Sequence, residues 1–207
     1  MQNKPSRTLF GIASTFLLLT SACFGPSEKG DMVASNSSPW IQASPILRQQ
    51  IEDEAARLPW TRGFERLEQI RWFASVGEPG YPDILELAQD PRDDVAAAAL
   101  AALGATLDRR LVPHIRALPY GPERNPDLML ERARTLVRLG DWSEIPVLIK
   151  GLSDERLYTR SLSVEALREA TRENMGFDPR AQEDRRQQAI NRWREWWLAR
   201  SGEGLLD

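Results

Sequence analysis

From residue 44 onward, apolar residues recur at helical spacing, and no stretch shows the apolar–polar alternation of a β-strand. A separate apolar run lies near the N-terminus, from Leu9 to Leu19. The pattern therefore predicts an all-α protein preceded by an N-terminal segment of another kind. We expect one domain, because 207 residues with 42% hydrophobic residues are enough for one packed core.

A register links three of the predicted helical stretches. Each begins with a dipeptide that ends in proline, and these are Tyr81-Pro82, Val112-Pro113 and Ile145-Pro146. The prolines are 31 and then 33 residues apart, and an aliphatic residue follows each by two positions, at Ile84, Ile115 and Leu148. A leucine further along keeps the register, at Leu103, Leu136 and Leu167. Such a register predicts an internal structural repeat.

Each repeated unit is predicted to be a short helix, a turn and a longer helix. Proline suits the first turn of a helix, because its missing N–H would have no partner there. The two extra residues of one unit fall in the turn at 119–126, which is rich in proline and leaves both flanking helices in phase. Gly104 and Gly140 are predicted to end the longer helices.

The segments that flank the repeats are predicted to cap them. Residues 44–77 have the pattern of a degenerate helix pair, in which Trp72 takes the place of the repeated leucine. Residues 172–207 contain a tryptophan-rich helix at 181–200. Ile190, Trp193 and Trp197 share one face of it and are interpreted as the core of the cap, whereas Trp196 is expected to be more exposed.

At residues 78–171 the sequence resembles the HEAT-like (PBS-lyase-type) helical repeats of bacterial proteins. The stretches DDVAAAALAALG and TRSLSVEALREAT resemble the second helix of such a repeat, and ENMGFDPRAQEDRRQQAINRWREWW resembles the C-terminal end of these proteins. The sequence departs from the pattern at Ala96, where a basic residue is common, and at Arg132, where a small one is usual. The resemblance implies an α-solenoid of about three clear repeats with N- and C-terminal capping helices.

The first 22 residues have the organisation of a secretory signal. A basic start with Lys4 and Arg7 is followed by an apolar run that is too short to span a bilayer, and then by small residues. The stretch LTSAC, which ends at Cys23, resembles the lipobox of bacterial lipoproteins. That resemblance implies cleavage before Cys23 and acylation of this residue with chains such as palmitate. An ordinary cleaved signal and an uncleaved anchor are the alternatives.

The residues after Cys23 indicate where in the cell the protein would be located. Phe24 stands where Asp would imply retention at the inner membrane, so the resemblance implies a lipid-anchored protein of the cell envelope, on the outer membrane and facing the periplasm. Residues 23–43 are rich in Gly, Ser, Pro and Asn and are predicted to form a flexible tether.

Charge and composition exclude several function classes. Residues 1–22 hold two of the 27 basic residues and none of the 30 acidic ones, so the net charge changes from −3 to −5 without them. An acidic balance argues against nucleic-acid binding. The single Cys and single His allow neither a disulfide within the chain nor a His/Cys metal site. We find no phosphate-binding loop or nucleophile motif, and so expect no cofactor, metal or catalytic residue.

Several candidate residues have simple structural interpretations. His114 is interpreted as a surface residue in the first turn of a helix, and Asp93 with Asp94 as acidic residues at a helix start, where the helix dipole favours them. The candidate partner-binding residues are basic positions of the longer helices and two residues of the long turn: Arg92, Arg132, Arg134, Arg138, Arg156, Arg160, Tyr120 and Arg124. Several arginines on one face would suit an acidic segment of a partner protein.

The sequence therefore favours a membrane-anchored, non-catalytic scaffold or adaptor of the bacterial cell envelope. It would bind a protein partner on a helical-repeat surface. The alternatives are a lyase or hydrolase on a HEAT-like scaffold and an assembly factor for an envelope complex. The absence of a second Cys or His argues against the lyase.

Overall fold

A computed structural model describes residues 38–202, and within this range every regular element is helical. The predicted all-α class is therefore confirmed for this part of the chain. The predicted signal (1–22), Cys23 and most of the tether (23–43) lie outside the described residues. None of the described helices is both long and apolar enough to cross a membrane.

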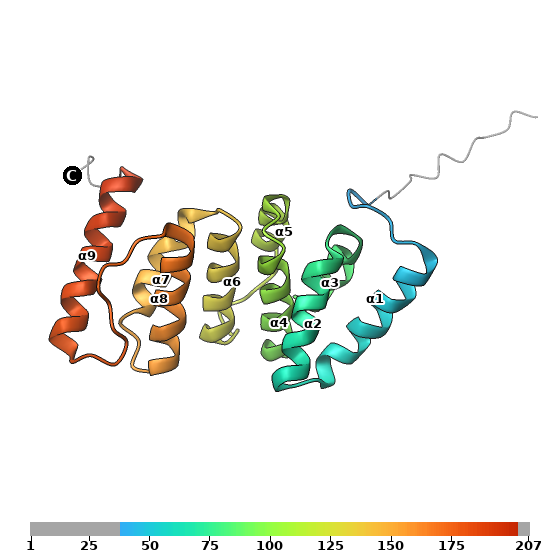
Figure 1. Cartoon of the computed structure of the whole chain (residues 1–207), viewed down its shortest axis with the longest axis horizontal. Coiled ribbons are helices and arrows are strands. Elements are labelled where there is room, and N and C mark those ends of the chain that lie inside the picture. The colour runs from blue at the N-terminus through green and yellow to red at the C-terminus, as the bar shows by residue number, and fades with distance from the viewer. Residues whose placement is uncertain (1–37, 203–207) are drawn as a thin grey trace, which may run out of the picture. The chain divides into compact units, whose positions relative to one another are not determined.

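Longer helices follow shorter ones along most of the chain (Figure 1). Short 3₁₀ turns, at η2 (Glu78–Gly80), η3 (Arg109–Leu111) and η4 (Trp142–Glu144), lead into α3, α5 and α7, and a fourth, η1 (Leu58–Trp60), follows α1. The α-helices are α1 (Pro45–Arg57), α2 (Gly63–Val76), α3 (Tyr81–Leu87), α4 (Asp93–Ala105), α5 (Val112–Arg116), α6 (Pro126–Arg138), α7 (Ile145–Gly151), α8 (Leu157–Thr171) and α9 (Glu183–Ser201).

The three short helices begin where the proline register predicts. α3 starts at Tyr81, α5 at Val112 and α7 at Ile145, each with its proline in the first turn. The aliphatic residues two positions after the prolines are fully buried, and so are the register leucines of the longer helices; these residues are Ile84, Ile115, Leu148, Leu103, Leu136 and Leu167. The register therefore marks core positions.

The longer helices are neighbours in chain order, because α2 contacts α4, α4 contacts α6, and α6 contacts α8. Figure 1 shows these helices side by side, with the short helices α3, α5 and α7 behind or beside them. Small side chains on α4 allow a close approach: a Cβ added at Gly104 would lie 3.4 Å from the Cα of Thr135 in α6. Gly104 is the last residue but one of α4, so the helix ends one residue later than predicted. The small size of Gly104 also lets α6 approach.

The core has two large parts. One extends from Trp40 to Leu139 and the other from Leu130 to Trp193, so residues of α6 contribute to both. In α2 it is Phe73 that is fully buried, whereas Trp72, predicted to take the leucine position, is only partly buried. The two rings contact each other at 5.0 Å between centroids.

The end of the predicted tether packs against the helices. Trp40 is 8% exposed, and its ring meets Tyr81 edge-on, with 4.9 Å between centroids. The neighbouring Ile41 N–H donates to the carboxylate of Glu78 at 3.2 Å. Residues 40 and 41, which were predicted to belong to the tether, are therefore held against the helices, because a large aromatic side chain gains more by burial than the short segment loses in freedom.

The C-terminal helix covers the last part of the core. Trp193 and Ile190 are buried, as predicted for the cap. Trp197 and Trp196 are both partly buried, so the predicted difference between them is not observed. Trp196 contacts Trp142, Trp193 and Trp197 at centroid distances of 6.3, 5.5 and 6.5 Å. The ring of Trp142 packs beside that of Trp196 and shields it from solvent.

Candidate functional site

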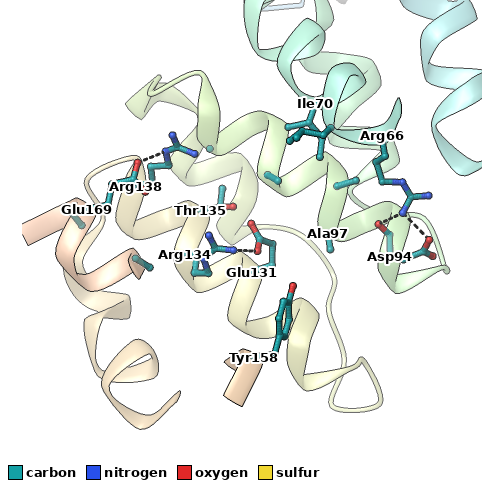
Figure 2. A pocket seen from close by; sticks show the side chains of 16 residues that line it. Arg66, Ile70, Asp94, Ala97, Glu131, Arg134, Thr135, Arg138, Tyr158 and Glu169 are labelled. Atoms are coloured by element: carbon teal, nitrogen blue, oxygen red, sulfur yellow. Dashed lines mark hydrogen bonds and ion pairs between the residues drawn. The ribbon is translucent and has the colours of Figure 1, made fainter. Parts of the chain in front are cut away.

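The longer helices together form a groove on one face, which we call the central groove. It is lined by residues of α2, α4, α6 and α8 and has a volume of about 430 Å³. Figure 2 shows labelled side chains from all four helices pointing toward this space. Its floor is made of small side chains, chiefly Ala97, Ala101, Gly104, Thr135 and Ala166. Small floor residues let a ligand or a helix approach the backbone closely.

Exposed hydrophobic side chains flank this floor. Leu67 in α2 is 41% exposed and Tyr158 in α8 is 65% exposed, and both line the groove. Large apolar side chains left in water beside an apolar floor are typical of an interaction surface. Tyrosine is also enriched where proteins bind one another.

The charges of the groove are paired. Arg66 contacts Asp94 at 2.8 Å, and Arg138 contacts Glu169 at 3.1 Å. Arg134 pairs with Glu131 within the same helix at 2.5 Å. Figure 2 shows each pair on the wall of the groove. Because each of these arginines faces a carboxylate, the groove presents a balanced polar rim around an apolar floor rather than a positive face.

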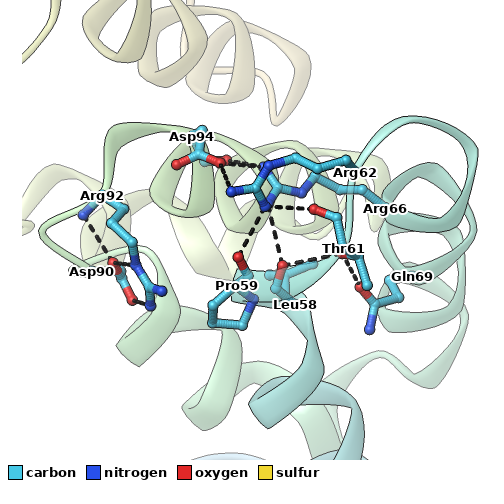
Figure 3. Close-up of polar contacts among 9 residues, drawn as sticks. All are labelled: Leu58, Pro59, Thr61, Arg62, Arg66, Gln69, Asp90, Arg92 and Asp94. Atoms are coloured by element: carbon cyan, nitrogen blue, oxygen red, sulfur yellow. Dashed lines mark hydrogen bonds and ion pairs between the residues drawn. The ribbon is translucent and has the colours of Figure 1, made fainter.

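Asp94 is the point where two helices are joined at one end of the groove. Arg62 and Arg66 both reach its carboxylate, at 3.4 and 2.8 Å, and Arg66 also donates to the carbonyl of Leu58 (Figure 3). The hydrogen bond from Arg66 lowers the pKa of Asp94 below its usual value, and the charges of Arg66 and Arg62 add to this effect. Asp94 therefore stays ionised and holds α2 against α4.

Glu131 has the opposite electrostatic character. Burial in the groove wall raises the pKa of its carboxyl, although Arg134 and Arg138 favour the ionised form. A carboxyl buried in this way is protonated more readily than that of an exposed glutamate.

Only two of the eight candidate partner-binding residues, Arg134 and Arg138, line the central groove. Arg132 turns away from it and donates to the carbonyls of Ile115 and Arg116, at 3.4 and 3.1 Å. Its side chain therefore links α6 to the preceding short helix.

Arg160 is a buried structural residue, with an exposed fraction of 8%. Its guanidinium donates to the carbonyls of Pro179, Asp154 and Glu155, at distances of 2.7 to 3.0 Å. These bonds hold the segment before α9 against the start of α8. Arg160 is therefore not available to a partner.

Arg92 and Arg156 occupy equivalent positions in two turns. Each binds an aspartate two residues earlier, Asp90 at 2.7 Å and Asp154 at 3.1 Å. Arg92 is drawn in Figure 3, and its guanidinium lies 5.9 Å from the ring of Trp60. Both arginines are exposed, outside the central groove.

The long turn packs against the preceding unit. The hydroxyl of Tyr120 donates to the carbonyl of Ala88 at 2.6 Å, and burial raises the pKa of Tyr120 to about 12. Arg124 contacts Asp93 at 2.8 Å and donates to the carbonyl of Asp90 at 3.0 Å. Tyr120 and Arg124 therefore anchor the turn, and neither lines the groove.

The remaining titratable candidates show no catalytic arrangement. Asp93 and Asp94 are each held by a different arginine, Arg124 and Arg66. His114 is exposed, with its ring 5.1 Å from that of Trp40. Among residues 38–202, no group of three or more His, Cys, Asp or Glu side chains is placed to hold a metal ion.

Sequence reasoning missed the apolar part of the groove. Leu67 and Tyr158 fall outside the core register, and nothing in the spacing of the alanines of α4 indicates that they line a groove. The sequence alone does not mark Leu67 and Tyr158 as exposed, because other large apolar residues outside the register, such as Leu111 and Phe73, are fully buried. Comparison with known proteins finds no matching family model and no significantly similar curated protein, so the function is argued from the chain's own residues.

Proposed function

We propose that this protein is a lipid-anchored, non-catalytic scaffold of the bacterial cell envelope that binds a partner protein in the central groove. The observation that carries the proposal is the apolar floor between α4 and α8 with exposed Leu67 and Tyr158 beside it. The four helices α2, α4, α6 and α8 all contribute to this face. A surface that runs across several helices suits an elongated segment of a partner, such as a helix.

The proposal includes a HEAT-like repeat architecture. It is supported by the proline starts of α3, α5 and α7 and by the serial contacts of α4, α6 and α8. It also includes acylation of Cys23 after removal of residues 1–22, which the lipobox-like stretch supports. Acyl chains would hold the protein on the outer membrane, facing the periplasm.

The groove favours a helix with an apolar face over a strongly acidic segment. Its arginines are already paired with Asp94, Glu131 and Glu169, so an acidic partner would have to displace those carboxylates. An alanine-rich floor instead lets the apolar side of a partner helix lie close to α4. A hydrolase is less well supported, because the carboxylates of the groove are held by arginines.

The groove is tested by photo-crosslinking in cells. A photoreactive amino acid at position 67 or 158 is expected to capture the same partner. Ala101→Arg, which places a long charged side chain on the floor, is expected to abolish both crosslinks. Ala199→Arg is the matched control, because Ala199 is exposed on α9 and outside the groove. Equal crosslinking in both variants would refute the groove as the binding site.

Anchoring is tested separately. Cys23→Ser is expected to abolish acylation of the mature chain, as measured by mass spectrometry, and to release the protein from the membrane fraction. An acylated mature chain in that variant, or an unmodified Cys23 in the native protein, would contradict the anchor without affecting the groove.

A further inference from the structure

A second hollow lies between α7 and α9, and we call it the α7–α9 pocket. Its volume is about 430 Å³, and its apolar wall includes Ile149, Trp197 and Leu198. Its polar lining consists of Lys150, Ser153 and Arg194. None of these residues lines the central groove, so the pocket is a separate feature of the molecule.

The charge in this pocket is unbalanced. Both cations line it, and no acidic side chain does. Within the described range 38–202, neither Lys150 nor Arg194 forms an ion pair, and the polar contact of Arg194 is to the side chain of Asn191 at 3.4 Å. In the central groove, by contrast, Arg66, Arg134 and Arg138 each meet a carboxylate.

The apolar wall is open to a ligand. Leu198 is 47% exposed and Trp197 is partly exposed, so both present carbon surface beside the two cations. The volume lies within the range of small-molecule sites in proteins, roughly 300–1,000 Å³. Apolar walls with a few placed polar groups are also typical of such sites.

We infer that the α7–α9 pocket binds an anionic amphiphile, that is, one carboxylate or phosphate head group on an apolar chain. Lys150 and Arg194 bind the head group, and the chain lies against Ile149, Trp197 and Leu198. Arginine forms paired hydrogen bonds with either anion, and lysine supplies a point charge. This activity goes beyond scaffolding and does not depend on the central groove.

The test uses calorimetric titration of the 207-residue chain carrying Cys23→Ser, so that no acyl group competes. Octanoate and octyl phosphate are the two anionic probes, and octylammonium and octanol are the controls. We expect at least one anion to bind, and both controls to bind roughly tenfold more weakly or not at all. Preference between octanoate and octyl phosphate identifies the head group. Equal binding of octylammonium, or no binding of either anion, overturns the inference.

Variants locate the site. Lys150→Gln and Arg194→Gln are each expected to weaken binding roughly tenfold, and Lys150→Arg to retain it. Arg185→Gln is the matched control, because it removes the same charge from an exposed position of α9 outside the pocket. Leu198→Asp, which places a carboxylate in the pocket, is expected to abolish binding. Unchanged affinity in the Lys150, Arg194 and Leu198 variants would overturn the site, with circular dichroism verifying that each variant is folded.

Discussion

The hydroxyl of Thr135 in α6 donates a hydrogen bond to the main-chain oxygen of Leu100 in α4, at 3.0 Å. The bond crosses two neighbouring helices and lies in the buried layer beneath the central groove, where Thr135 is 2% exposed. A small residue at position 104 brings the backbones this close, since a Cβ added there would already touch Thr135. The floor of the groove therefore depends on the spacing between α4 and α6.

Enlarging residue 104 tests this spacing. Gly104→Leu is expected to lower the free energy of unfolding by about 1–3 kcal/mol, because the added side chain meets the backbone of Thr135 and overpacks the layer. Gly104→Ala is the control, because its Cβ makes ordinary contacts and alanine favours the helix by about 1 kcal/mol. Urea unfolding measures both, and equal loss in the two variants would contradict the close approach.

Removing the Trp40 ring tests the attachment of the N-terminal segment. Trp40→Ala is expected to cost about 3 kcal/mol of unfolding free energy, because the ring is buried against Tyr81. In this variant, the peptide bonds of residues 38–44 should also be cleaved faster in limited proteolysis. Trp60→Ala is the control, since Trp60 is 80% exposed and its loss should change stability by less than about 0.5 kcal/mol.

Arg160 is expected to matter for stability rather than for partner binding. Arg160→Met leaves three backbone carbonyls without their donor and should cost about 2–4 kcal/mol in thermal or urea unfolding. Arg156→Gln, at an exposed position, should cost clearly less, because solvent screens its ion pairs. A larger effect at Arg156 than at Arg160 would refute this assignment.

The pKa of Glu131 should lie above its usual value, and the pKa of Asp94 should lie below its usual value. Carbon-detected NMR is expected to place the pKa of Glu131 above 4.5 and that of Asp94 below 3.8. Arg134→Gln should raise the pKa of Glu131 further, because an opposing charge is lost. Arg66→Gln should raise that of Asp94 toward 3.8, because its largest stabilising hydrogen bond is removed.

The two shifts affect stability with opposite signs. The pKa of Asp94 is depressed in the folded state, so its contribution is fully present above about 3.8 and is lost as the pH falls through the lower folded value. The pKa of Glu131 is raised, so its ionisation disfavours folding once the pH rises above 4.5. The raised pKa of Glu131 predicts that the protein becomes more stable as the pH is lowered from 7 toward 4.5. Glu131→Gln should flatten this rise, and an unchanged melting profile would contradict the burial of this carboxyl.

Much of the helical architecture could be predicted from the sequence. The starts of α3, α5 and α7 follow from proline, which acts on its own residue and the one before it. The buried register residues, such as Leu103 and Leu136, follow from helical periodicity, which is also local. Position 140 behaved as predicted, because its φ of +90° is a conformation that glycine adopts without strain.

The candidate site was predicted less well, because it depends on residues that meet only after folding. Arg134 pairs with Glu131 three residues earlier in the same helix, a contact that can be expected from the spacing alone. Arg66 instead pairs with Asp94, which is 28 residues away in the sequence. The sequence shows several candidate arginines on or beside the longer helices, but it does not show that Arg160 is buried or that Arg132 turns to the carbonyls of another helix.

The sequence by itself determined the all-α class, the starts of the three short helices and the buried residues of the register, because proline geometry and apolar periodicity act over a few residues. Tertiary structure decided which arginines are neutralised, that Gly104 lets α4 and α6 approach closely, and that Lys150 and Arg194 line one pocket. Charge pairing and cavity formation depend on distances between helices far apart in the chain. Those distances are set by the packing of all the side chains between them.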